Sequence, residues 1–169
     1  EDGQKRRERN FKDGERDSTW TTWYENGNKK FLASYSDGKL NGKYIRWYEG
    51  GIIKELDGEY LNNKKHKKWI YWSTSGQKTE EINYDNGVHQ GSHIKWFGEK
   101  SDQHKKFHIN YKDGKKDGIW HHWYSSGVDS LKASYANGEK DGHWIWWRKN
   151  GLKDKEGFYP LRPGIDKVI

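Results

Sequence analysis

Cysteine and methionine are both absent from the 169-residue chain, and proline occurs only twice. Without cysteine the protein has no disulfide, no thiolate ligand for zinc and no cysteine nucleophile. No apolar run approaches the roughly 20 residues of a membrane-spanning helix, and no signal-peptide core is present. The chain also lacks a P-loop, a dinucleotide-binding fingerprint and a nucleophile motif. We therefore expect no transmembrane segment and no enzymatic activity.

Branched aliphatic residues are scarce as well. Leu, Ile, Val and Phe make up about 15% of the chain, and the net charge is +7. That combination is typical of disordered proteins. The chain nevertheless has 11 Trp and 11 Tyr, and each such side chain can bury about 150–250 Å². We therefore expect a folded protein with an aromatic core in place of an aliphatic one.

The aromatic residues recur at a fixed interval, which predicts a repeat protein. One tryptophan per repeat, at spacings of 24, 25, 24, 27 and 24 residues, occupies Trp23, Trp47, Trp72, Trp96, Trp123 and Trp147. Twelve residues before each of them is Phe11 or a tyrosine. The sequence thus predicts a half repeat over residues 1–12, then six copies that end near Tyr35, Tyr60, Tyr84, Tyr111, Tyr135 and Tyr159, and a capping tail over 160–169.

Two turns in each repeat predict a pair of antiparallel strands. Asp-Gly or Asn-Gly, as at Asp37-Gly38, supplies the positive φ angles of a two-residue hairpin turn. A second glycine-containing turn follows the repeating tryptophan, and the two insertions fall there, after Trp47 and after Trp96. We predict an all-β fold: an elongated, twisted antiparallel meander of hairpins, similar to a solenoid. Insertions on one rim of such an array often belong to a binding site.

Alternation along the strands predicts two faces. We place the repeating tryptophans and tyrosines together on one packed face. The other face then mixes aromatic residues with cations, so it is either solvated or a binding surface. The insertion rim is the alternative place for binding, and the basic run at Asn62–Lys68 is either a further part of the binding surface or a solvated turn. The candidate residues are Trp20, Tyr24, Tyr44, Tyr48, Trp69, Tyr71, Lys64, Lys65, Lys67, Lys68, Phe97 and Trp146.

The segment Asp113–Tyr124, followed by Gly127 and Tyr135, resembles the MORN repeat. More closely it resembles the bacterial MORN-2 variant of YwqK-family antitoxin-like proteins. The resemblance covers nearly the whole chain, although both glycines are replaced within Asn62–Lys68 and His93 replaces an aromatic residue. It implies a twisted single-sheet array that acts as a protein-interaction scaffold, as an immunity or antitoxin protein, or at phospholipid surfaces. It implies no catalytic residues.

Histidine and aspartate offer little chemistry in this pattern. His89 and His93 are four residues apart, a spacing that brings two side chains together on a helix but not across a turn and a strand. The remaining pair, His104 and His108, flanks an insertion, where surface placement is the simpler interpretation. Most aspartates occupy turns, as Asp113 does. We expect no metal, no cofactor and no catalytic residue.

These observations leave three binding hypotheses. The first is a protein partner, with the chain acting as an interaction scaffold or as a subunit of a larger envelope complex. The second is an anionic lipid surface, suggested by the lysines of Lys64–Lys68. The third is a glycan, because repeated tryptophans also occur in cell-wall-binding modules. The 25 acids beside 32 bases argue against a dedicated nucleic-acid binder.

The cellular location stays open between two alternatives. The sequence does not begin with methionine, so we expect that a leader or upstream segment is missing from it, which favours an exported or envelope protein. An immunity role would place the protein in the cytoplasm.

Overall fold

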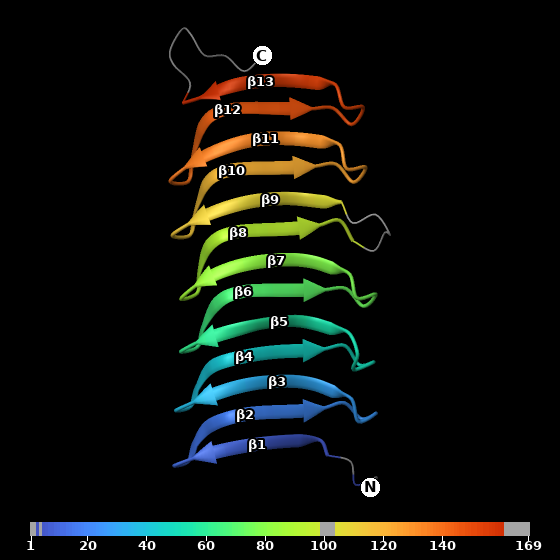
Figure 1. Cartoon of the computed structure of the whole chain (residues 1–169), viewed down its shortest axis with the longest axis vertical. Coiled ribbons are helices and arrows are strands. Elements are labelled where there is room, and N and C mark those ends of the chain that lie inside the picture. The colour runs from blue at the N-terminus through green and yellow to red at the C-terminus, as the bar shows by residue number, and fades with distance from the viewer. Residues whose placement is uncertain (1–2, 4, 99–103, 161–169) are drawn as a thin grey trace. The chain divides into compact units, whose positions relative to one another are not determined.

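The computed structural model describes residues 3, 5–98 and 104–160 of the chain, and these residues form β-strands joined by short turns. The strands are β1 (Arg7–Lys12), β2 (Glu15–Trp23), β3 (Lys29–Ser36), β4 (Lys39–Trp47), β5 (Lys54–Leu61), β6 (Lys64–Trp72), β7 (Lys78–Asp85), β8 (Val88–Trp96), β9 (Lys105–Lys112), β10 (Lys115–Trp123), β11 (Asp129–Ala136), β12 (Glu139–Trp147) and β13 (Lys153–Tyr159). Their order in the sheet follows their order in the chain (Figure 1). The predicted all-β antiparallel meander is confirmed.

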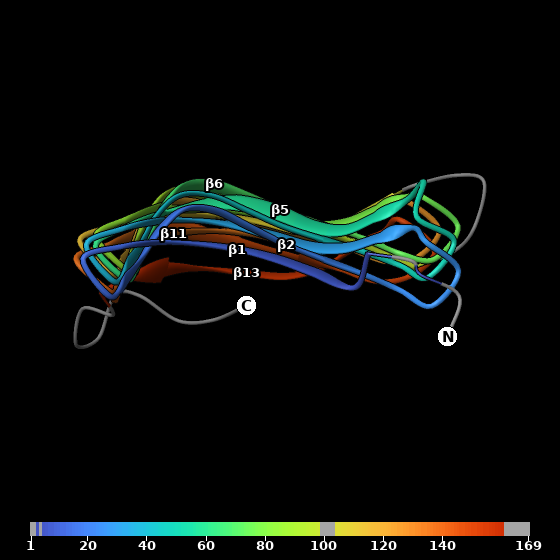
Figure 2. The same ribbon diagram turned by 90° about the horizontal axis from the view of Figure 1, so that it is seen from below.

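The chain divides into two compact units. Unit 1 comprises Glu1–Thr79 with Tyr84–Val88, and unit 2 comprises Glu80–Asn83 with His89–Ile169. Within the described part of each unit the strands form a single layer, with neither a helix nor a second sheet on its faces (Figure 2). The insertion residues 99–103 and the tail residues 161–169, for which the sequence predicts a rim and a cap, lie outside the described residues.

The hairpin turns are those that the sequence predicts. Both turn residues have positive φ in all six cases: Asp13-Gly14, Asp37-Gly38, Asn62-Asn63, Asn86-Gly87, Asp113-Gly114 and Asn137-Gly138. Asn tolerates this conformation because its short polar side chain can bond locally. The turn without glycine, at φ 48° and 66°, therefore keeps the same geometry as the others. In five of the second turns one glycine also has positive φ: Gly27, Gly51, Gly76, Gly127 and Gly151.

The predicted division of side chains between the two faces is wrong. In a two-residue hairpin each tyrosine pairs with the residue five positions later, as Tyr60 does with Lys65. Directly paired residues share a face, so Trp69, four residues beyond Lys65 in β6, lies on the same face as Tyr60. The repeating tryptophan, Trp72, then lies on the opposite face by alternation.

The aromatic ladder face is therefore defined by two columns. One contains the tyrosines Tyr35, Tyr60, Tyr84, Tyr111, Tyr135 and Tyr159. The other contains Trp20, Tyr44, Trp69, His93, Trp120 and Trp144. The second face carries Trp23, Trp47, Trp72, Trp96, Trp123 and Trp147, together with Thr21, which is buried. The most deeply buried large side chains belong to the ladder face, so the core of each unit lies there.

Candidate functional site

Trp69 and Trp144 are the centres of two aromatic clusters on the ladder face, one in each unit. The Trp69 ring lies 5.0 Å from Tyr60 and 5.7 Å from Tyr44, measured between centroids. The Trp144 ring lies 5.2 Å from both Tyr135 and Tyr159. These separations fall in the range in which tilted aromatic pairs attract each other. Burial raises the pKa of the Tyr60 hydroxyl.

Cations cover these rings at the same position of several repeats. In four repeats the residue five positions after the repeat tyrosine, or after Phe11, is a cation that lies over a ladder aromatic: Arg16 over Trp20 at 4.8 Å, Lys65 over Trp69 at 4.4 Å, Lys116 over Trp120 at 4.0 Å and Lys140 over Trp144 at 4.7 Å. A cation in this geometry contributes about 0.5–2 kcal/mol. The aromatic residues and cations that the sequence suggests for one face therefore also stack on each other within a repeat.

Trp69 is not part of an exposed binding surface, contrary to the prediction. Its side chain is 1% exposed, and its indole N–H donates to the Glu59 carbonyl oxygen at 3.1 Å. The indole ring fits against the sheet because residue 58 is glycine, since a Cβ atom at that position would overlap the ring. Trp144, which lies opposite Gly157, is buried in the same way. The predicted residues Trp20, Tyr44, Tyr71 and Trp146 also lie on the ladder face, but they are partly exposed.

Two other predicted residues hold the rim of the sheet together. The hydroxyl of Tyr24 donates to the Trp47 carbonyl oxygen at 2.7 Å, and that of Tyr48 donates to the Trp72 carbonyl oxygen at 2.8 Å. Tyr124 makes the equivalent bond to Trp147. Phe97 has no hydroxyl for such a bond, and its ring instead lies 5.9 Å from the Lys106 ammonium.

The basic run at Lys64–Lys68 does not form a patch on one face. Lys65 lies on the ladder face, where its ammonium donates to the Tyr71 hydroxyl at 3.0 Å. Lys67 forms an ion pair with Glu59 at 2.8 Å. Hydrogen bonds from Lys67 and Lys43 hold the pKa of the Glu59 carboxyl below its usual value. Lys64 and Lys68 are exposed. The cations of the run are therefore divided between the two faces, and Lys67 is paired with an acid.

The histidines do not form a metal centre in the part of the chain that the structure describes. No group of three or more suitable side chains there could hold a metal ion. His104 and His108, the pair that the sequence suggests, have different neighbours. His104 contacts the Ser125 carbonyl oxygen, and His108 lies opposite His121. His121 is 2.7 Å from Asp129, and His93 is 2.7 Å from Glu80. Both histidines therefore have carboxylate partners.

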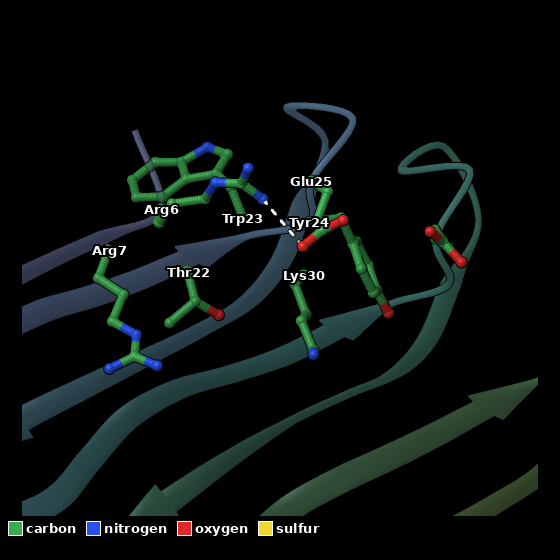
Figure 3. Close-up of a pocket in the computed structure, with 8 residues that line it drawn as sticks. Arg6, Arg7, Thr22, Trp23, Tyr24, Glu25 and Lys30 are labelled. Atoms are coloured by element: carbon green, nitrogen blue, oxygen red, sulfur yellow. Dashed lines mark ion pairs between the residues drawn. The ribbon is translucent and has the colours of Figure 1, made fainter. Parts of the chain in front are cut away.

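A pocket of about 510 Å³ lies beside the start of β1, at a place that the sequence reasoning missed. It is lined by Arg6, Arg7, Thr22, Trp23, Tyr24, Glu25, Lys30 and Glu49. Figure 3 shows Thr22 between the cationic groups of Arg7 and Lys30, while Arg6 forms an ion pair with Glu25 at 3.7 Å. The signal in the sequence is the basic Lys5–Arg9 segment, with four cations among five residues. This pocket and the adjacent β1 edge form the candidate site.

Two comparisons with known proteins found no match. No protein-family model matches the chain, and no curated protein matches it. The described residues contain no helix with the length and apolar character required to cross a membrane.

Proposed function

We propose that the protein is a non-catalytic scaffold that binds another protein through its repeat sheet. The observation that carries the proposal is the single-layer construction: both faces of the sheet in each unit are uncovered within the described residues. A sheet with no second layer offers far more accessible side chains than a sandwich of the same length. The resemblance of the repeat to the MORN type, whose members serve as interaction scaffolds, supports the same conclusion.

The ladder gives this scaffold the rigidity that specific binding needs. Its rings are fixed by aromatic contacts and by indole hydrogen bonds, so little side-chain freedom is lost when a partner binds beside them. Around this fixed framework lie exposed apolar side chains. Ile52 in the first insertion is 90% exposed, and Phe11 in β1 is 59% exposed. Apolar and aromatic anchors of this kind dominate the energetics of protein interfaces.

The test is capture of a partner followed by reconstitution. The immobilised chain is exposed to an extract of its source organism, and each retained protein is purified and titrated against the free chain by calorimetry. We expect at least one retained protein to bind the purified chain with saturable stoichiometry. An unrelated basic β-protein of similar charge is the control. The scaffold proposal is wrong if no retained protein binds again when pure.

A glycan is a second candidate ligand, because the second face carries a row of regularly spaced tryptophans. In unit 1 that face carries Trp23, Trp47 and Trp72 on alternate strands, which corresponds to a spacing of about 10 Å. An extended β-linked polysaccharide presents equivalent ring faces at a similar period, so each tryptophan could stack on every second sugar. Binding to insoluble cellulose or chitin tests this candidate, and Trp47→Ala is expected to weaken it. A wild-type chain that remains in the supernatant with both polymers excludes it.

The anionic-lipid alternative depends on the Lys64–Lys68 run, whose cations the fold divides between the two faces. Co-sedimentation with vesicles that contain or lack anionic lipid tests it. We expect no dependence on lipid charge, because these lysines cannot all face one membrane surface.

A further inference from the structure

A second pocket, of about 220 Å³, lies in unit 2 on the second face of the sheet. Its lining consists of His104, Lys105, Trp123 and Gly127. Trp123 belongs to the second face, and Lys105 lies on that face because it pairs directly with Trp96 of β8. Pockets for drug-sized molecules measure about 300–1,000 Å³. This one therefore has room for a smaller group, such as a single sugar ring.

The tryptophan that forms the wall of this pocket is held in place. The rings of His121 and Trp123 are 3.7 Å apart between centroids, at an angle of 32° between their planes. His121 is fixed in turn by a hydrogen bond to Asp129 at 2.7 Å. An ordered ring loses little side-chain freedom when a ligand stacks on it. Because Trp123 is also partly exposed, it can serve as a stacking surface.

His104 has a fixed orientation beside the same wall. Its Nδ1 atom is 3.1 Å from the carbonyl oxygen of Ser125. That oxygen can only accept a hydrogen bond, so Nδ1 carries the proton and Nε2 is the acceptor of the neutral ring. The ring lies over Gly127, where a Cβ atom would come within 2.9 Å of it. The pocket thus combines an aromatic wall with a hydrogen-bond acceptor for a hydroxyl group.

The charge at this pocket is positive. Lys105 is exposed and, in the described part of the chain, takes part in no ion pair. The acid that pairs with Trp123 across the next hairpin is Asp129, and it is already held by His121 at 2.7 Å and by Lys132 at 3.2 Å. Burial is the main cause that lowers the pKa of His108 on the same face, and the charge of Lys105 lowers it further. An anionic group would therefore be stabilised beside Lys105.

The equivalent place in the next repeat has different chemistry. An acid replaces the lysine there, and an aliphatic side chain replaces the histidine. The backbone supports the comparison, since Trp123 pairs with Asp129 as Trp96 pairs with Lys105. The four residues at that place are Val128, Asp129, Trp147 and Gly151. The combination of a stacking surface with a free cation thus distinguishes the pocket at Trp123 from its neighbour.

We propose that this pocket binds an acidic sugar residue of a glycan, with the pyranose ring on Trp123 and the carboxylate on Lys105. The negative face of an indole attracts the C–H groups of a sugar ring, and an ammonium group forms charge-assisted hydrogen bonds with a carboxylate. A nucleotide also combines a ring with an anion, but it is of drug size and exceeds the pocket. The inference goes beyond the scaffold function, and it concerns another unit than the tryptophan row considered for cellulose or chitin.

The test uses a short β-linked oligosaccharide that alternates glucuronate with N-acetylglucosamine, with binding measured by calorimetry. The matched control ligand is the same oligosaccharide after reduction of each carboxylate to a hydroxymethyl group. We expect the acidic form to bind at least about tenfold more tightly, because the reduced form lacks the charge-assisted hydrogen bond. A nucleoside monophosphate is the third ligand, and we expect it to bind more weakly than the acidic oligosaccharide.

Two pairs of variants locate the site. Lys105→Gln removes the charge and Trp123→Ala removes the stacking surface, while Lys153→Gln and Trp147→Ala are the matched controls at another directly paired lysine and tryptophan of unit 2. Each pocket variant should lower the affinity by about tenfold and each control by less than about twofold. Lys105→Arg should bind nearly as well as the wild-type chain, because it keeps the charge. Circular dichroism checks that each variant is folded, and the exposed position of Lys105 keeps the test valid if Trp123→Ala does not fold.

Three results would each overturn the inference: no binding of the acidic oligosaccharide to the wild-type chain, binding of the reduced form or of the nucleotide at least as tight, or equal losses in the pocket and control variants. The outcome is separable from that of the scaffold proposal. A captured protein that binds Lys105→Gln as tightly as the wild-type chain supports the scaffold function without bearing on the sugar site. If no protein is captured, the scaffold proposal fails, and the calorimetry still decides the sugar site.

Discussion

The seventh residue after Phe11, and after each repeat tyrosine from Tyr35 to Tyr135, adopts a left-handed backbone. Four of these positions are glycine: Gly42, Gly91, Gly118 and Gly142. The other two are Ser18 and Lys67, with φ of 57° and 58°. A side chain with a Cβ atom costs about 1–2 kcal/mol in this conformation. The two exceptions are therefore strained points in a bulge that glycine fits better.

We predict that Ser18→Gly raises the free energy of unfolding by about 1 kcal/mol, because it relieves this strain. Urea denaturation measures the change. The reverse substitution, Gly118→Ser, is the matched control, since φ is +81° there and a Cβ atom would meet nothing within 4 Å. It should destabilise by a similar amount through the backbone alone. Shifts in the same direction for both variants would contradict the strain argument.

Histidine burial makes stability depend on pH near neutrality. Desolvation is the main cause that lowers the pKa of His108, His121 and His122. For His122 the neighbouring Lys106 and Lys116 lower it further. Below the ordinary histidine value the unfolded chain then binds more protons than the folded one, so stability falls as the pH decreases. Carboxyl groups with lowered pKa values, such as Glu59, lose their contribution only at more acidic pH.

We predict a lower free energy of unfolding at about pH 5.5 than at about pH 7.5. His122→Tyr should reduce this difference, because tyrosine occupies the equivalent position in β6 as Tyr71 and does not titrate in this range. Denaturation curves at the two pH values measure the effect. An unchanged difference in the variant would show that His122 does not contribute.

The buried tryptophans can pack closely on the sheet because small residues lie directly opposite them. In unit 1 the Trp69 ring occupies the place that a Cβ atom of Gly58 would take. We predict that Gly58→Ala destabilises the protein by about 1–3 kcal/mol, because overpacking forces the ring out of its position. Gly50→Ala is the control, since a Cβ atom there meets nothing within 4 Å. Equal losses in the two variants would argue against the steric cause.

The turns of these hairpins could be predicted from the sequence because Asp-Gly and Asn-Gly dictate local dihedral angles. The faces were assigned wrongly because Tyr60 and Trp72 are separated by twelve residues, an even number, which suggests a common face. The intervening turn pairs Tyr60 with Lys65, an odd offset. Trp69 therefore joins the tyrosine, and Trp72 does not. A count of residues through the turn would have found this arrangement.

The pocket could not be predicted from periodicity. Lys30 is the extra residue where the register of β2 and β3 shifts between Thr22 and Trp23. Tyr24 reaches across the rim to the next repeat. The position of Lys30 depends on a bulge, and that of Tyr24 depends on a long-range hydrogen bond. Neither feature gives this repeat a sequence pattern that differs from those of the other repeats.

Within each of the two compact units, the described strands contact their neighbours in the sequence. In repeat proteins of this kind, stability is the sum of the repeats' own terms and of interfaces between nearest neighbours. A local defect should therefore lower stability locally. Gly142 provides a counterpart to Gly58 in unit 2, since a Cβ atom there would lie 2.9 Å from the Ser134 hydroxyl oxygen at a φ of +64°.

We predict that Gly58→Ala increases amide hydrogen exchange in β4–β6 of unit 1 and leaves the protection of β10–β12 in unit 2 nearly unchanged. Gly142→Ala should produce the reverse pattern. The reason is that exchange reports local opening, and each substitution strains contacts only within its own unit. Hydrogen exchange followed by mass spectrometry measures both patterns, with Gly50→Ala as the control that changes neither. A uniform loss of protection across both units in each variant would instead show that the chain unfolds as one cooperative body.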